Sequence, residues 1–313
     1  MMGKDFNAEQ FNNVTENIPF LESSMITKMI DTIKQRAQSM IHVEDQLLKL
    51  ISCIDLTSLN SVDTDNVIEQ LIDKAILPYL AKPETRCAAV CAYPARVAGA
   101  KHYLHSKYGQ QQPLTICSVA AGFPSGQYRI ESKILEVELA VEDGANEIDI
   151  VISRDAAMEH DWKRIYDEVV ALKTCCGSNC MKTILATGEL QNEQNIYRAS
   201  WAAMLAGSDF IKTSTGKEKV NATYEAAYVM CHAIKQFYSA TGKKVGFKAA
   251  GGIRSTLEAL GYLAMVNEIL GAEWLKPNLF RIGASICNQH SSNSINFKFD
   301  FRQIIAFFYY VVA

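Results

Sequence analysis

The 313-residue sequence lacks long apolar runs and carries no large excess of charge of either sign. No run of apolar residues approaches the roughly 18 that a membrane-spanning helix needs. The polar start MMGKDFNAEQFNN lacks the apolar core of a signal peptide. Lys and Arg total 31 against 34 Asp and Glu, so the net charge of −3 gives no reason to expect nucleic-acid or membrane partners. These absences predict a soluble, cytoplasmic protein.

The nine cysteines include no CxxC pair. Cys175, Cys176 and Cys180 lie close together in the sequence, but no histidine is near them. Free thiols in a reducing cytosol are therefore the default interpretation, and a metal site at this cluster is the alternative.

Short apolar or β-branched runs alternate with amphipathic stretches of helical length. The expected strands are 51–57, 86–93, 114–123, 147–152, 181–187, 209–215, 245–252 and 279–285. Strands separated by helices must run parallel, and eight such units match a closed TIM (βα)8 barrel. A doubly wound open sheet is the alternative, but it would usually have fewer strands and a GxGxxG turn after the first one, which this sequence lacks.

The two ends of the chain fall outside this repeat. Residues 1–50 are predicted to form an N-terminal helical extension that caps the floor of the barrel domain, residues 51–285. Residues 286–313 form an atypical C-terminal segment, because an eighth helix should begin there but the apolar residues alternate at the period of a strand. The alternating residues are Ile295, Phe297, Phe299 and Phe301.

Ionisable side chains stand in or beside the predicted strands. In a barrel of this kind, the carboxyl ends of the strands and the loops after them build the active site. The residues concerned are Asp55, Cys91, Asp149, Lys182, Lys212 and Lys248. A single buried lysine commonly snorkels or pairs with an acid. Three lysines and two aspartates converging from different strands instead predict a polar cavity, because isolated charges cost several kcal/mol to bury.

Neighbouring lysines have a chemical use. A free lysine has a pKa near 10.4, so only about one molecule in 2,500 is neutral at pH 7. A second ammonium group and partial desolvation both disfavour the charged form. A shift of about three units, roughly 4 kcal/mol, would raise the neutral fraction about a thousandfold. A neutral amine attacks carbonyl carbons to give a Schiff base, and the iminium then accepts the electrons released by carbon–carbon cleavage.

Glycine recurs in the loops after the last three strands, where barrels bind phosphate. These loops contain 214–217, 251–252 and 283–285. Glycine lets backbone N–H groups approach an anion, and a helix N-terminus adds its dipole. One such glycine alone would more often mark a turn, but three consecutive loops favour a phosphate site. A P-loop is excluded because Ile211 replaces its first glycine and Glu218 follows Lys217.

Five motifs together resemble the deoxyribose-phosphate aldolase family of class I aldolases. They are DFIKTSTGK (209–217), GFKAAGGIR (246–254), EIDIVI (147–152), KTILATGEL (182–190) and CIDLT (53–57). The resemblance extends over residues 50–285 and implies a TIM barrel. It also implies the reversible cleavage of 2-deoxy-D-ribose 5-phosphate, a small sugar phosphate, into D-glyceraldehyde 3-phosphate and acetaldehyde. No metal or organic cofactor is implied.

The resemblance assigns roles to particular residues. Lys212 would form the Schiff base, and Lys248 would lower its pKa and join a proton relay with Asp149. Lys182 and Asp55 would organise the relay and hold the substrate. Cys91 matches a cysteine that lines the site, although a packed thiol is an equal interpretation. The implied phosphate ligands are Gly216, Lys217, Gly251, Gly252, Arg254 and Ser285.

The sequence departs from the family at a few positions. Ala249 replaces a proline, and Ile286 stands where a hydroxyl residue is common. Tyr309 and Tyr310 are candidates for the role of a terminal tyrosine in proton transfer. Two other functions stay open, a non-catalytic barrel scaffold with a damaged tail and a Schiff-base aldolase with another donor. The oligomeric state is also open, a homo-oligomer included.

Overall fold

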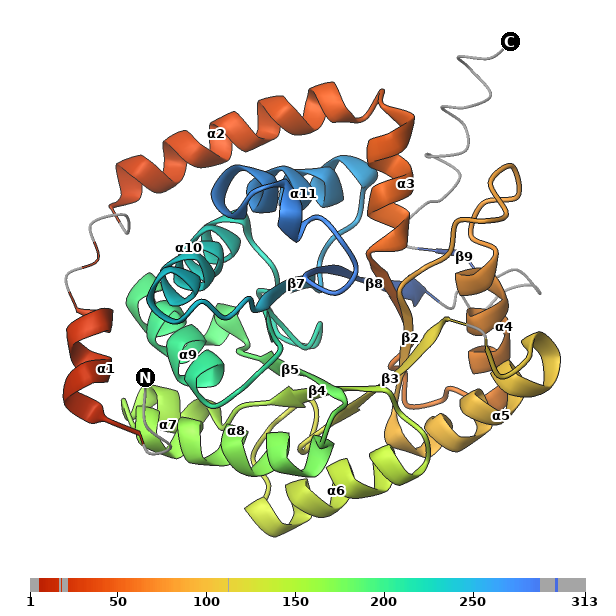
Figure 1. Ribbon diagram of the computed structural model, residues 1–313, viewed down its shortest axis with the longest axis horizontal. Helices are drawn as coiled ribbons and strands as arrows, with labels where there is room; N and C mark the ends of the chain where they lie inside the picture. The colour runs from red at the N-terminus through yellow and green to blue at the C-terminus, as the bar shows by residue number, and fades with distance from the viewer. Residues whose placement is uncertain (1–5, 17, 19–21, 112, 288–295, 298–313) are drawn as a thin grey trace.

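The computed structural model describes residues 6–16, 18, 22–111, 113–287 and 296–297, with backbone only for 286–287 and 296–297. Eight parallel strands follow one another in chain order, and the eighth is hydrogen-bonded to the first, which closes a barrel (Figure 1). The strands are β1 (Ile54–Thr57), β2 (Ala89–Ala92), β3 (Thr115–Ala120), β4 (Glu147–Val151), β5 (Cys180–Ile184), β6 (Phe210–Lys212), β7 (Gly246–Ala250) and β8 (Phe280–Cys287). The predicted TIM barrel is confirmed, and the open sheet is excluded by the β1–β8 pairing.

The predicted strand positions are confirmed, with small changes at the ends. Each strand lies within its predicted run, except that β5 begins one residue earlier and β8 continues two residues further. The connecting helices form the outer ring (Figure 1). They are α4 (Asp65–Ile76), α5 (Val97–Tyr108), α6 (Ile130–Glu142), α7 (Arg154–Met158), α8 (Trp162–Cys176), α9 (Glu193–Leu205), α10 (Tyr224–Thr241) and α11 (Thr256–Leu270). No helix in the described part of the chain is long and apolar enough to cross a membrane.

The N-terminal segment is helical, but two of its helices do not cap the floor. These helices are α1 (Ala8–Thr15), α2 (Ser23–Met40) and α3 (Glu44–Ser52). The buried face of α2 packs against α10 and α11, and α1 packs against α9, so both lie outside the outer ring (Figure 1). The predicted floor position is therefore wrong for α1 and α2, because amphipathic spacing reveals that a face is buried but not what buries it.

The C-terminal segment begins as a strand. A short strand, β9 (Asn296–Phe297), pairs antiparallel with residues 286–287 at the end of β8. The strand signal is confirmed at Phe297, and no helix follows β8 within the described residues. The predictions for Ile295, Phe299, Phe301, Tyr309 and Tyr310 lie outside the described residues.

The interior of the barrel has an apolar part and a charged part. Successive side chains of a strand point to opposite faces, so every second residue enters the barrel. The apolar part is formed by Leu59, Ala89, Cys91, Cys117 and Val119, packed against Tyr93 and Phe123. The charged side chains come from β1 and from β4 to β8. An apolar surface therefore lies on one side of the charged side chains inside the barrel.

Candidate active site

Asp149 lies at the centre of the charged part of the barrel. Its Oδ2 accepts hydrogen bonds from Lys212 Nζ and Lys248 Nζ, each at 2.8 Å. Its Oδ1 accepts from Lys182 Nζ at 2.9 Å and from Cys117 Sγ at 3.2 Å. Strands β3 to β7 thus direct five side chains to one point. The structure brings together the three lysines and the aspartate that the sequence selected.

Two further acids and an arginine complete the cluster. Asp55 accepts from Lys248 and Arg281, and lies 3.6 Å from Lys182 Nζ. Glu147 accepts from Arg281 Nη2 at 2.6 Å and also pairs with Lys182. The sequence analysis missed Glu147 and Arg281. Strand periodicity could have found both, because Glu147 lies two residues before Asp149, and Arg281 two before an inward-facing glycine.

This cluster contains more cations than carboxylates. Four cationic groups face three acids, and all are buried. The cations are Lys182, Lys212, Lys248 and Arg281, and the acids are Asp55, Glu147 and Asp149. A surplus positive charge in a dry interior is costly, so loss of one proton would balance the cluster.

The cluster fixes the charge of most of its members. Burial alone would raise the pKa of Asp149, but the ammonium groups of Lys182, Lys212 and Lys248 hold that pKa well below its usual value. Burial alone would lower the pKa of Lys248, yet the carboxylates of Asp149 and Asp55 raise it. Lys182 behaves in the same way, and its pKa is raised well above the ordinary value by the acids around it. Lys248 and Lys182 are therefore ammonium groups at neutral pH.

Lys212 has the fewest acidic contacts of the four cations. It contacts only Asp149, whereas Lys248 contacts two carboxylates and Lys182 three. It is also the least buried of the three lysines, with 3% of its surface exposed against 0% for the other two. Of the three lysines of this cluster, Lys212 therefore makes the fewest ion pairs, so the fewest would be lost if its amine became neutral.

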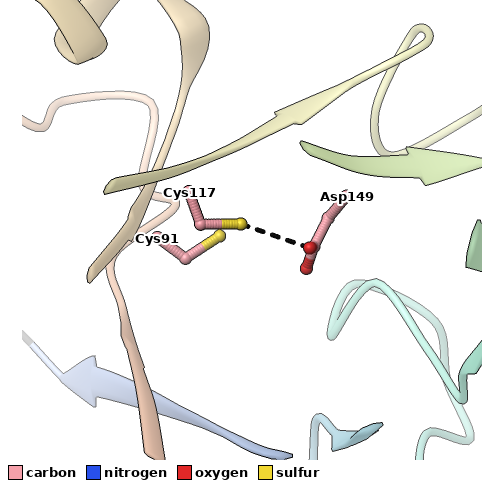
Figure 2. A group of neighbouring side chains, drawn as sticks. All are labelled: Cys91, Cys117 and Asp149. Atoms are coloured by element: carbon pink, nitrogen blue, oxygen red, sulfur yellow. Dashed lines mark hydrogen bonds between the residues drawn. The ribbon is translucent and has the colours of Figure 1, made fainter. Parts of the chain in front are cut away.

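Cys91 and Cys117 form the thiol edge of the site beside Asp149 (Figure 2). They are register partners on β2 and β3, and both are fully buried. A hydrogen bond with Cys117 lowers the pKa of Cys91, although burial opposes it. Burial raises the pKa of Cys117 well above the usual value. Cys91 thus both packs in the apolar wall and lies next to the catalytic candidates, so both interpretations of it describe the same position.

Cys91, Cys117 and Asp149 are also potential metal ligands, with their ligand atoms within 4.8 Å of one another. Both oxygens of Asp149 already accept hydrogen bonds from lysines. Ammonium groups at these distances oppose the approach of a cation, so the donor set does not suit a resident metal. The thiols of Cys175, Cys176 and Cys180 form no comparable group among the described residues, so the metal alternative gains no support there.

Four of the predicted phosphate ligands, Gly216, Lys217, Gly251 and Gly252, lie in the loops after β6 and β7. Gly216, Gly251 and Gly252 have φ angles of +86°, +79° and +78°, which favour glycine. A Cβ atom added to Gly216 would lie 3.9 Å from the Cα atom of Gly251, so the loops after β6 and β7 adjoin. Lys217 Nζ reaches the carbonyl oxygen of Leu59, after β1, at 2.7 Å. These contacts bring the β1, β6 and β7 loops to one rim.

The remaining predicted ligands are Arg254, in the loop after β7, and Ser285, in β8. Ser285 is exposed at the end of β8 and is the register partner of Thr57 on β1. The side chain of Arg254 is exposed, and its backbone N–H donates to Glu258 at 2.6 Å. The N–H of Gly216 donates to Glu218, so this donor is already used.

The fold and the site define a class of protein, a βα barrel with a buried lysine cluster suited to carbonyl chemistry. A family model described as DeoC/LacD family aldolase matches residues 49–275. A Caenorhabditis elegans relative is 56% identical over 264 residues, which are 84% of this chain and 86% of that protein. The chain belongs to the DeoC/LacD family of aldolases.

Named relatives and a solved structure agree with this assignment. Proteins from Homo sapiens and Bos taurus named deoxyribose-phosphate aldolase are each 50% identical over 248 residues, 76% of this chain and 77% of theirs. A tetrameric deoxyribose phosphate aldolase from Aeropyrum pernix has a TM-score of 0.60 at 24% identity, covering 80% of this chain and 92% of that one. The last comparison concerns the fold alone.

Proposed function

We propose that this protein cleaves 2-deoxy-D-ribose 5-phosphate reversibly into D-glyceraldehyde 3-phosphate and acetaldehyde through a Schiff base on Lys212. The observation that carries the proposal is the sharing of Asp149 Oδ2 by Lys212 and Lys248, each at 2.8 Å. Membership of the aldolase family and the names of the human and bovine relatives support the substrate.

The charge balance of the cluster supplies the nucleophile. Release of the Lys212 proton leaves three cations and three carboxylates, because Lys248 and Arg281 keep their protons between two acids each. The neutral amine of Lys212 then attacks C1 of the open-chain sugar phosphate, and loss of water gives the iminium. The apolar wall beside Cys91 excludes water from the new bond.

Carbon–carbon cleavage needs a base for the C3 hydroxyl. Asp149 is ionised and lies next to Lys212, and with Lys248 it would orient a water or hydroxyl that takes this proton. The C2–C3 bond breaks, its electron pair moves into the iminium as an enamine, and D-glyceraldehyde 3-phosphate leaves. Protonation of the enamine carbon and hydrolysis then release acetaldehyde and restore Lys212. Lys182 and Asp55 hold Asp149 and Lys248 in place.

The phosphate would bind at the rim of the barrel. Lys217 supplies the positive charge, exchanging its contact with Leu59 for the phosphate. The positive φ angles of Gly251 and Gly252 let the backbone approach an anion closely. Gly216, Arg254 and Ser285 border the same rim and complete the proposed set.

Borohydride trapping tests the proposal. We expect acetaldehyde and borohydride to leave a reduced ethyl group on the peptide containing Lys212, with no adduct in Lys212→Arg. A matched surface control, Lys244→Arg, should be trapped like the wild type, because Lys244 pairs with Glu273 and with the rings of Tyr238 and Trp274, outside the lysine cluster. A scaffold without activity would give no adduct in any variant. An aldolase with another donor would be trapped faster by a different carbonyl compound than by acetaldehyde.

We also propose that the protein works in a reducing compartment and associates with itself. The eight cysteines whose side chains are described are all free, which suits a reducing compartment such as the cytosol. The tetramer of the Aeropyrum pernix protein supports self-association, which light scattering after size-exclusion chromatography would measure. The division at residues 1–50, 51–285 and 286–313 stays part of this proposal.

A further inference from the structure

Arg154 connects the loops that surround one side of the barrel mouth. It is the first residue of α7, directly after β4, and its side chain is 18% exposed. Its Nη2 donates to the carbonyl oxygens of Pro124, at 2.9 Å, and Ser125, at 2.5 Å, in the loop after β3. Its Nη1 donates to Glu189, after β5, at 2.5 Å, and lies 3.9 Å from Glu218, after β6. From its own position after β4, one guanidinium group thus contacts the loops after β3, β5 and β6.

Glu218 shapes the loop after β6 from within. Its carboxylate accepts from the N–H of Thr215 at 3.0 and 3.1 Å and from the N–H of Gly216 at 3.1 Å. The N–H of Lys217 donates to Thr215 Oγ1 at 3.1 Å. Residues 215–218 therefore wrap around a carboxylate that is only 1% exposed.

A buried carboxylate needs donors and a positive charge close by. Two backbone N–H groups supply the donors, and Arg154 is the cation within ion-pair distance. Removing Arg154 would leave the Glu218 carboxylate without this cation, and removing Glu218 would leave the N–H groups of Thr215 and Gly216 without their acceptor. Either change would free the loop to move. The segment that would move carries Lys217, whose ammonium group is the main positive charge of the proposed phosphate site.

We propose that Arg154 and Glu218 are positioning residues that fix the loop of residues 215–217 and so hold the ammonium group of Lys217 in place for the substrate phosphate. This inference rests on the proposed function. Neither side chain contacts Asp149 or Lys212 in the structure, so the reacting groups do not depend on them directly. We expect the contact of Lys217 with the phosphate to be equally strong in the bound sugar phosphate and in the transition state, so its misalignment should raise KM more than it lowers kcat.

Three variants separate this role from a structural one. We expect Glu218→Gln and Arg154→Met to raise the KM for 2-deoxy-D-ribose 5-phosphate by about tenfold, with kcat within about threefold of the wild type. Arg154→Lys, which keeps the charge but not the fork, should recover part of the loss. The matched control is Glu189→Gln, because Glu189 also contacts Arg154 but its side chain is 48% exposed. It should leave KM unchanged.

Two further measurements do not depend on cleavage. The dissociation constant of inorganic phosphate, measured by calorimetry, should rise about tenfold in Glu218→Gln, in parallel with KM. The rate of acetaldehyde trapping on Lys212, which involves no phosphate, should stay within about twofold. Equal phosphate affinity in Glu218→Gln and the wild type, or an equal fall in trapping and phosphate affinity, would overturn the inference. A wild type that binds phosphate without cleaving the sugar phosphate would overturn the proposed function alone.

Discussion

At Arg281, two acids of the cluster depend on the geometry of one side chain. Its Nη1 donates to both Asp55 and Glu147, and its Nη2 donates to Glu147. The side chain is 6% exposed. Asp55 in turn holds Lys248, the neighbour of Lys212 on the next strand. Two ion pairs, Arg281–Asp55 and Asp55–Lys248, therefore connect Arg281 to the lysine beside Lys212.

A lysine cannot make the contacts that the two terminal nitrogens of Arg281 make with Asp55 and Glu147. We expect Arg281→Lys to lower the free energy of unfolding by about 2–4 kcal/mol, because a single ammonium group leaves one buried acid without its partner. The measurement is urea unfolding, with kcat followed in parallel and expected to fall by about tenfold. Arg129→Lys, at a side chain that is 86% exposed, is the control and should change neither quantity. Equal stability of the two variants would show that Arg281 is not needed by the cluster.

The sequence was informative about single residues where a charge interrupts an apolar strand. Lys182, Lys212 and Lys248 stand out in this way, and the structure places all three on Asp149. Cys117 gave no such signal, because a thiol in an apolar run resembles any other core residue. Glu218 was used only to reject a P-loop, since its contacts with the backbone of its own loop cannot be seen without coordinates.

At the scale of elements, periodicity predicted the strands and helices well, but not the partners of the N-terminal helices. Once eight βα units are recognised, the strand order of a closed barrel is determined, because each strand pairs with the next and the last pairs with the first. A helix outside the repeat has no such constraint. The helix α2 buries Ile26, Ile30, Ile33 and Ala37 along one face, and only the structure shows that α10 and α11 cover this face.

This position predicts a helix that supports stability but not catalysis. Ile33 is fully buried, so Ile33→Ala should lower the free energy of unfolding by about 2–5 kcal/mol through lost burial and a cavity. Because α2 lies outside the ring, kcat at a temperature where the variant is folded should not change. Met25→Ala on the same helix is the control, since Met25 is 46% exposed. A loss of kcat in folded Ile33→Ala would mean that α2 acts on the site.

For the molecule as a whole, buried ionisable groups limit the acid side of stability. The pKa values of Asp55 and Asp149 are lowered by the cations around them, although burial opposes this. As pH falls below about 4, these two carboxylates are protonated in the unfolded chain but stay ionised in the folded protein, so the free energy of unfolding decreases. Burial lowers the pKa of His232 to about 4, so the same loss begins for this group near pH 6.5.

On the alkaline side, the pKa values of Cys53, Cys180 and Lys248 are shifted upward, with the same consequence for stability. Burial raises the pKa of Cys53 to about 11 and that of Cys180 to about 12. The unfolded chain loses these protons from about pH 8.5, before the folded protein does, so stability falls as pH rises. Lys248, whose folded pKa is raised, adds to the loss above about pH 10.4.

The two limits together predict a plateau of stability between about pH 6.5 and 8.5, where none of these groups changes its charge in either state. We expect the free energy of unfolding in urea to fall on both sides, with Cys53 alone accounting for about 2–3 kcal/mol by pH 11. Cys53→Ala should therefore be less sensitive to alkali than the wild type, and His232→Gln less sensitive between pH 6.5 and 4. A stability that keeps rising from pH 9 to 11 would contradict this account, because it would require that the thiols ionise more easily in the folded protein than in the unfolded chain.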